Sequence, residues 1–187
     1  MNVFAVRAAE LAGARPELAG AVEPLLKARE AVGRQIADLD RKVMRLARNV
    51  AQVRQFMTAP GIGPITALCF LATIDDPTRF RRSRSVGAYV GLTTRRYASG
   101  ETDWTGRISK CGDKMLRTYL YEAANVLLTR VAKWSALKAW GIRLAKRSGL
   151  RKAKVAVARK LAVILHRMWI EGSEFKWSSK EAANQPA

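Results

Sequence analysis

Apolar residues recur at alternating intervals of three and four positions between Val22 and Met57. This is the a/d spacing of a heptad repeat, and it predicts one amphipathic helix over residues 22–57 that is interrupted only by Arg29. β-Branched residues at a with leucine at d favour a two-stranded coiled coil. The seam predicted to form a homodimer or higher oligomer is Val32, Ile36, Leu39, Val43, Leu46, Val50 and Val53. The alternative is an amphipathic helix packed on residues 2–14 of the same chain.

The first 21 residues carry a different pattern. Gly13, Pro16 and Gly20 lie within them and Pro24 follows. Glycine and proline interrupt helices, so we expect residues 1–21 to be irregular or only briefly helical.

The seam ends at TAPGIGPITA, residues 58–67. Gly61 and Gly63 flank Ile62, and Pro64 stands where the first turn of a helix would lie. Helix, glycine turn and helix form the helix-hairpin-helix pattern, in which the backbone approaches DNA and N–H groups at the second helix hold a phosphate. We predict DNA contact by Gly61, Ile62 and Gly63; the alternative is a helix connection that binds nothing.

Glycine, serine and threonine then alternate with charged residues over 91–113, where TTRRYAS faces DWTGRIS. This composition predicts a basic loop or a small β-hairpin. A helical spacing returns from Asp113 onwards, and a last amphipathic helix is predicted over 155–169.

The predicted fold class is therefore mainly α. An N-terminal coiled-coil helix over 22–57 precedes a domain over 58–172, which holds the helix-hairpin-helix-like element, the basic loop and the C-terminal helices. Residues 173–187 are polar and are expected to form a disordered tail.

Charge sharpens this picture. The chain of 187 residues has a formal net charge of +19, and residues 123–170 hold twelve lysines and arginines with no acid. Such a block needs a polyanion, and nucleic acid is the first choice, with an anionic membrane surface as the alternative. No apolar run is long enough to span a bilayer and no signal-peptide pattern is present, so we expect a bacterial cytoplasmic, nucleoid-associated protein.

The acids and metal-binding residue types are sparse. Cys69, Cys111 and His166 are far apart, and Asp75-Asp76 precede a proline as in a turn. A metal-dependent nuclease needs carboxylates that converge on the ion, so we expect no metal site and no cofactor within this chain. His166 is expected to be a surface or capping residue.

Ser99 is the candidate nucleophile. It precedes Gly100, and we expect Arg95, Arg96, Arg107 and Lys110 to surround a phosphate beside it. Residue types alone leave open a turn serine, because other hydroxyls share the loop.

Further basic residues are predicted to contact nucleic acid, with a solvated helix face as the alternative. They are Arg81, Arg82, Arg84, Lys114, Arg147, Arg151, Lys152 and Lys154.

Three ordered motifs, PGIGPITA, RFRRSRSVGAYVGLTTRRYASG and GRISKCGDKMLR, together resemble the C-terminal domain of the IS110 transposase family, which is grouped with IS116 and IS902. The likeness covers about residues 56–120. Thr94 stands where the family usually has proline, which should loosen the turn without removing function.

The resemblance implies that Ser99, within Tyr97-Ala98-Ser99-Gly100, is the serine that attaches covalently to DNA. It further implies a DNA recombinase guided by a bridge RNA, whose N-terminal RuvC-like domain carries a DEDD set of magnesium-binding acids. No segment of this sequence matches that domain, so we expect the chain to act as a C-terminal part that binds DNA and guide RNA and needs the acid-bearing domain for strand exchange. The rival hypothesis is a non-catalytic helix-hairpin-helix binding and dimerisation module, such as a truncated transposase.

Overall fold

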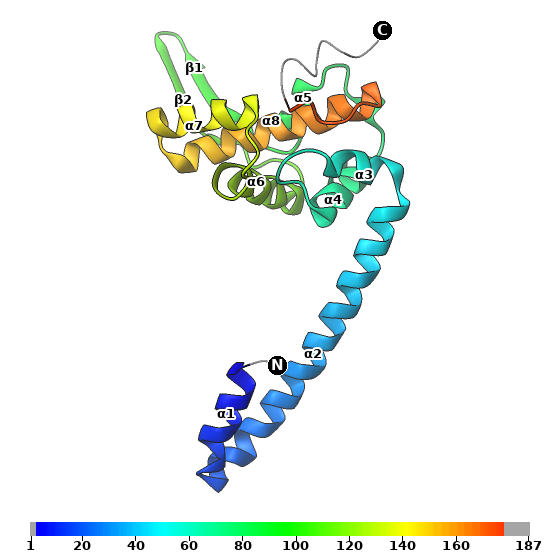
Figure 1. The fold of residues 1–187 in the computed structure, drawn as a ribbon. Coiled ribbons are helices and arrows are strands. Elements are labelled where there is room, and N and C mark those ends of the chain that lie inside the picture. The colour runs from blue at the N-terminus through cyan, green and yellow to red at the C-terminus, as the bar shows by residue number, and fades with distance from the viewer. Residues whose placement is uncertain (1–2, 178–187) are drawn as a thin grey trace. The chain divides into compact units, whose positions relative to one another are not determined.

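The computed structural model describes residues 3–177, which divide into a first unit ending at Leu46 and a second beginning at Ala47. The first unit holds helix α1 (Val3–Gly13) and most of helix α2 (Pro16–Asn49). The two helices form a hairpin, in which the Arg29 guanidinium of α2 lies over the Phe4 ring of α1 at 5.4 Å (Figure 1). Residues 3–21 are thus more helical than their glycines and prolines suggested.

Helix α2 continues through Gly20 and Pro24, which were expected to interrupt it. Proline has no N–H to donate to the carbonyl four residues earlier, here Gly20. The loss is limited to that turn, and the hydrogen bonds of a 34-residue helix on either side keep it continuous.

Much of the predicted seam is exposed in the first unit. Val32, Ile36, Leu39 and Leu46 are each more than half exposed, and Val43 is half-buried. Large apolar side chains at this spacing are the surface that a coiled coil covers.

The seam ends earlier than predicted, and this is a correction. Val50 has an extended backbone (φ −91°, ψ 115°), which separates α2 from helix α3 (Ala51–Met57). Val53 is fully buried in the core of the second unit, and Val50 packs against that core. These two residues therefore support the chain's own fold instead of an exposed dimer seam.

The second unit is a helical domain with one small sheet. After α3 come α4 (Pro64–Ile74), the short 3-10 helix η1 (Pro77–Arg79) and α5 (Arg84–Tyr89). Strands β1 (Thr94–Ser99) and β2 (Thr102–Ile108) follow, and then α6 (Lys114–Thr129), α7 (Ala136–Ser148) and α8 (Leu150–Glu171). The prediction of a mainly α fold is confirmed.

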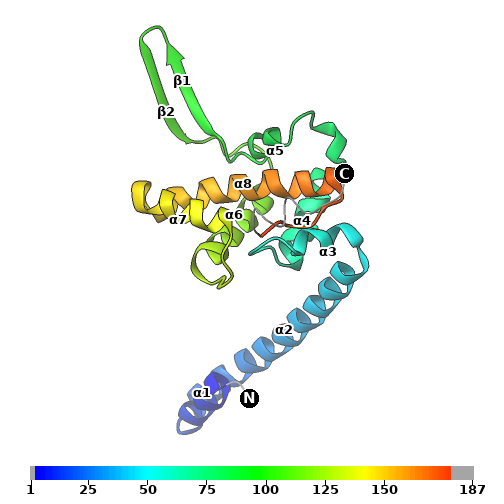
Figure 2. The same ribbon diagram turned by 45° about the horizontal axis from the view of Figure 1, so that its top comes forward.

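Helix α8 is the centre of this domain and packs against α3, α5, α6 and α7 (Figure 2). Its buried face includes Leu161 and Leu165, both with no exposed surface. Phe56, Phe70 and Trp169 complete the core at one end, with ring centroids 5.2 to 6.4 Å apart. Aromatic edge-to-face contacts of this kind add to the hydrophobic stabilisation of the core.

The start of the predicted disordered tail is held in place. Gln55 donates from Nε2 to the Ser173 carbonyl at 2.8 Å, and the Phe175 N–H donates to Thr58 Oγ1 at 3.0 Å. Phe175 also packs against the core. Residues 178–187, the rest of that tail, lie outside the described residues.

Strands β1 and β2 form an antiparallel hairpin that extends away from the helices of the second unit (Figures 1 and 2). The alternative of an irregular loop over 91–113 is therefore excluded. No helix within residues 3–177 has the length and apolar character to cross a bilayer.

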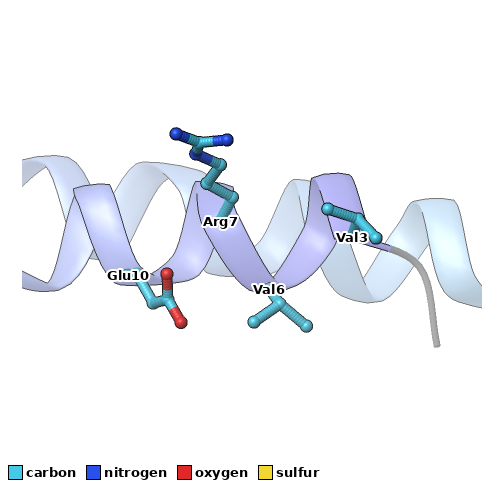
Figure 3. Close-up of a pocket in the computed structure, with 4 residues that line it drawn as sticks. All are labelled: Val3, Val6, Arg7 and Glu10. Carbon is cyan, nitrogen blue, oxygen red and sulfur yellow. The ribbon is translucent and has the colours of Figure 1, made fainter.

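An open pocket lies on α1, lined by Val3, Val6, Arg7 and Glu10 (Figure 3). None of the residues predicted to bind nucleic acid lines it.

Candidate nucleic-acid interface

Ser99 is the last residue of β1 and lies at the free end of the hairpin. It pairs with Thr102, so Gly100 and Glu101 form a two-residue turn. Gly100 has φ 54° and Glu101 has no positive φ, as in the type II′ turns that suit the twist of hairpin strands. Ser99 is exposed, and an added Cβ at Gly100 would meet nothing within 4 Å. The serine is therefore accessible from solvent.

The base of the hairpin is an interlock of two backbone segments. A Cβ at Gly91 would lie 2.0 Å from the Cys111 carbonyl oxygen, and one at Gly112 would lie 1.9 Å from the Tyr89 carbonyl oxygen. Both distances are far below van der Waals contact, so only glycine allows the segments before and after the hairpin to pack this closely. The Lys110 N–H also donates to the Gly91 carbonyl at 3.1 Å.

Arg117 on α6 reinforces this base, and the sequence analysis missed it. Its Nη1 donates to the Val90 carbonyl at 3.1 Å and to the Cys111 carbonyl at 3.2 Å. Asp113 caps α6 by accepting from the Leu116 N–H at 2.5 Å. The base is thus tied to both α5 and α6, and the signal in the sequence was the last residue of the GRISKCGDKMLR motif, which is Arg117.

The arginines of the hairpin do not form the ring that was expected around Ser99. Arg95 donates from Nη2 to the Ser109 carbonyl at 3.1 Å, toward the base. Lys110 also belongs to the base, whereas Ser99 ends a six-residue strand. At ~3.3 Å of rise per residue the two ends of that strand are about 17 Å apart, so one phosphate cannot contact both Ser99 and Lys110. Residues that are close in sequence were separated because the chain runs as an extended ribbon.

Arg96 is engaged by an acid. Its Nε and Nη2 donate to the two Asp103 carboxylate oxygens at 2.8 and 2.6 Å. These hydrogen bonds hold the pKa of the Asp103 carboxyl below its usual value and raise the pKa of Arg96. A phosphate that takes the Nε and Nη2 donors of Arg96 together must therefore displace Asp103. Among the described residues no acid forms an ion pair with Arg107 or Lys110, and both are exposed.

The PGIG turn joins α3 to α4, and less of its surface is available for nucleic acid than predicted. Gly61 has φ 81°, and a Cβ there would lie 2.4 Å from the Ala123 carbonyl oxygen of α6. Close packing of the turn against α6 therefore explains why position 61 is a glycine. Ile62 is only 6% exposed and its side chain belongs to the core, so the predicted contact of this residue with nucleic acid could involve only its backbone.

Gly63 and the start of α4 keep the surface that a phosphate contact requires. Gly63 has open space around it and is the N-cap of α4, where no side chain caps the helix. Pro64 at the first helical position has no N–H, so the donors that remain lie one and two residues further on.

The other predicted basic contacts lie at the surface. Arg81, Arg82 and Arg84 are exposed around the start of α5. Lys114 is exposed at the start of α6. Arg147, Arg151 and Lys152 are exposed around Gly149, where α7 ends and α8 begins. Lys154 is half-buried, with its ammonium 5.7 Å from the Tyr121 ring centre.

His166 is a structural residue, contrary to the expectation of a surface or capping position. It is 1% exposed. Its Nε2 donates to the Pro77 carbonyl at 2.8 Å, which leaves Nδ1 to accept from the Ser83 hydroxyl at 3.0 Å. Both ring nitrogens are thereby satisfied inside the domain, and η1 and the segment before α5 are fastened to α8.

Magnesium, which the family resemblance implies, does not fit this part of the chain. Among the described residues no group of three or more histidine, cysteine, aspartate or glutamate side chains could hold a metal ion. Ligands for such an ion would have to come from elsewhere.

The hairpin, its interlocked base and the PGIG turn all fall within one matched region. Residues 53–140 match the family described as Transposase IS116/IS110/IS902 family. The chain belongs to this family, as the three motifs indicated.

Curated relatives agree with this assignment. The chain is 35% identical over 142 residues to a transposase for insertion sequence element IS1111A of Coxiella burnetii, covering 75% of this chain and 38% of that protein. It is 34% identical over 165 residues to a probable family 20 transposase of Pseudomonas aeruginosa, covering 88% and 48%. A putative transposase of Sinorhizobium fredii is 32% identical over 150 residues, covering 79% and 39%. The chain thus spans less than half the length of these relatives.

Proposed function

We propose that this chain is the C-terminal part of a DNA transposase and supplies Ser99 as the nucleophile that attacks a DNA phosphodiester. The observation that carries the proposal is the position of Ser99, exposed at the end of a hairpin whose base is fixed by interlocked backbone. A nucleophile needs both access to its substrate and a defined location, and this arrangement provides both.

The reaction would be a transesterification. The Ser99 Oγ forms a bond to phosphorus, one bridging P–O bond of the DNA breaks, and the released DNA oxygen takes up a proton. The serine loses one proton in the same exchange, so atoms and charge balance without an oxidant or reductant. In this proposal any magnesium is held by acids outside the described residues.

Several surfaces of the second unit would hold the nucleic acid. Arg107 and Lys110 offer cations on the hairpin, and the uncapped N-terminus of α4 offers N–H groups to a phosphate. The exposed cations around Gly149 would hold DNA or a guide RNA. A bacterial cytoplasmic location beside the nucleoid follows from these partners.

Dimerisation belongs to the first unit in this proposal. The exposed apolar residues between Val32 and Leu46 would form a coiled-coil seam with a second copy. Ile36→Glu should abolish self-association in analytical ultracentrifugation, because it buries a charge in the seam. Arg34→Glu, on another face of the same helix, is the matched control and should leave the mass unchanged.

Ser99→Ala tests the nucleophile in a full-length transposase that carries this chain as its C-terminal part. We expect loss of transposition and of the covalent protein–DNA adduct on a denaturing gel, with DNA affinity retained. Ser109→Ala removes a hydroxyl at the hairpin base and is the control that should keep both activities. Transposition that survives Ser99→Ala would refute the proposal.

A non-catalytic binding module is the second candidate. It is favoured by the engagement of Arg96 with Asp103, which leaves Ser99 without the ring of cations that a phosphate site was expected to have. The same experiment separates the two, since a binding module retains full function without the Ser99 hydroxyl.

A further inference from the structure

The hairpin carries an exposed aromatic pair that the proposed chemistry of Ser99 leaves unused. The rings of Tyr97 and Trp104 are stacked, with centroids 4.3 Å apart and planes within 16° of parallel. Tyr97 is 44% exposed and Trp104 is 55% exposed. Every residue of β1 is exposed, so no core of the described chain covers this pair.

The strand register places this pair on the same face of the hairpin as Ser99. Tyr97 pairs with Trp104, and Ser99 lies two residues further along β1. Because side chains alternate between the faces of a strand, Tyr97 and Ser99 share one face and are about 7 Å apart along it.

Gly106 leaves one edge of the stack open. A Cβ at this position would lie 3.1 Å from Tyr97 Cε2 and 3.4 Å from Trp104 Cζ3. With glycine there, no side chain from residue 106 covers the rings, and a flat ligand can approach them.

Charges around the pair favour a nucleic acid as that ligand. Arg95 lies two residues before Tyr97 in β1, and Arg107 follows Gly106 in β2, where the strand register shifts between Thr94 and Arg96. On the opposite face Arg96 and Asp103 neutralise each other. Stacking rings flanked by cations are the combination that binds single strands, in which bases offer their faces and phosphates offer charge. A base inside an intact duplex is already stacked on both faces.

We propose that the Tyr97–Trp104 stack is a platform for an unpaired nucleobase next to the phosphate that Ser99 attacks. The base contacts the outer face or open edge of the pair, and its backbone then passes Ser99 on the same face of the hairpin. The location of the reacting phosphate rests on the proposed function of Ser99, whereas base binding stands independently of it.

A binding comparison tests the platform. The probes are a short single-stranded oligothymidine and an abasic strand of the same length and charge, measured with the full chain at one salt concentration. One stacked base contributes about a fivefold to hundredfold difference in affinity, so the chain should prefer oligothymidine by at least about fivefold. Equal affinity for the two strands would overturn the platform.

Trp104→Leu should reduce this preference to less than about twofold, and Trp104→Phe should retain most of it because a ring remains. Trp134→Leu is the matched control, since Trp134 is 61% exposed and lies outside the hairpin. Loss of the preference in Trp134→Leu but not in Trp104→Leu would assign base stacking elsewhere and refute the proposal.

The pair also stabilises the hairpin, and two readings separate that role from base binding. Nuclear Overhauser effects between the backbone protons of Arg96 and Thr105, which pair across the strands, report whether the hairpin remains formed in each variant. A platform predicts that Trp104→Leu loses the base preference while these contacts persist. A purely structural pair predicts that the preference is absent in the unaltered chain.

Failure of the platform is distinguishable from failure of the nucleophile. Ser99→Ala should keep the preference for oligothymidine and lose only the covalent adduct. If the adduct forms and the preference is absent, the platform is wrong and the proposed function stands.

Discussion

The hairpin and the helical core of the second unit are stabilised in different ways. Phe56, Phe70 and Leu165 have no exposed surface, and each is fixed by neighbours on other helices. The residues of β1 are all exposed, and the hairpin is defined by its turn, its cross-strand pairs and its base. A two-stranded hairpin alone is only marginally stable in water, so the interlocked base and Arg117 supply what a core would otherwise provide.

The difference separates residues that fold the domain from residues that meet its ligand. The exposed side chains of the hairpin can be substituted without leaving a cavity. Truncation of a buried core side chain leaves one. Proteins that share this helical core can therefore carry hairpins that bind different ligands.

The largest effect on this comparison should come from Phe56→Ala. Phe56 is fully buried between Phe70 and Trp169, and truncation of such a ring costs about 3–5 kcal/mol of unfolding free energy. Urea denaturation measures the loss. Tyr97→Ala, which truncates an exposed ring of the hairpin, is the control and should cost only about 1 kcal/mol or less. A similar loss of unfolding free energy in both variants would show that the hairpin contributes to the stability of the core.

Gly112→Ala should have the next largest effect, because it opens the base of the hairpin. The new Cβ would meet the Tyr89 carbonyl oxygen at 1.9 Å, and φ is 79°. A strained backbone of this kind costs about 1–3 kcal/mol, and here the cost is local. Hydrogen exchange should accelerate at the Ser109 and Lys110 amides, which bond to the Thr93 and Gly91 carbonyls.

Gly63→Ala is the matched glycine control. It has no atom within 4 Å of an added Cβ, so exchange at the hairpin base should be unchanged. Unchanged exchange in Gly112→Ala as well would show that the base is not held by the interlock.

The smallest effect concerns the Arg96–Asp103 pair, which is exposed on the hairpin. Since Arg96 lowers the pKa of the Asp103 carboxyl, the pair is complete above the usual carboxyl range and its contribution is lost as pH falls through the lowered pKa. The ¹³C shift of the Asp103 carboxyl should therefore titrate below about pH 4, the ordinary value for aspartate.

Asp103→Asn should free Arg96 at neutral pH and increase the salt dependence of DNA binding by about one phosphate contact. Asp76→Asn is the control, because the pKa of Asp76 is lowered chiefly by hydrogen bonds from Thr78 and, within residues 3–177, its carboxylate forms no salt bridge. The same salt slope in both variants would contradict a role for Arg96 in phosphate binding.

Local signals in the sequence predicted the helical class, the hairpin and the PGIG connection, because periodicity and glycine placement determine them. The end of the seam was not predictable in this way. Val53 keeps the three-and-four spacing after α2 has ended, since burial in a core and burial in a coiled coil require the same spacing.

Contacts between distant segments were also beyond the sequence. The partners of His166 are 83 and 89 positions away, so nothing local marks it as buried. The sequence did hold a signal for the cross-strand pair of Tyr97 and Trp104, because each lies three positions from the two-residue turn Gly100-Glu101.

The two-residue turn at Gly100 has a consequence for how such ribbons can vary in length. One residue added to each strand between the aromatic stack and the turn moves the tip further from the base but places the terminal serine on the opposite face from the stack. Two residues added to each strand extend the reach and restore the face. In relatives with a functional hairpin, the number of residues between the glycines that match Gly91 and Gly112 should therefore differ by multiples of four.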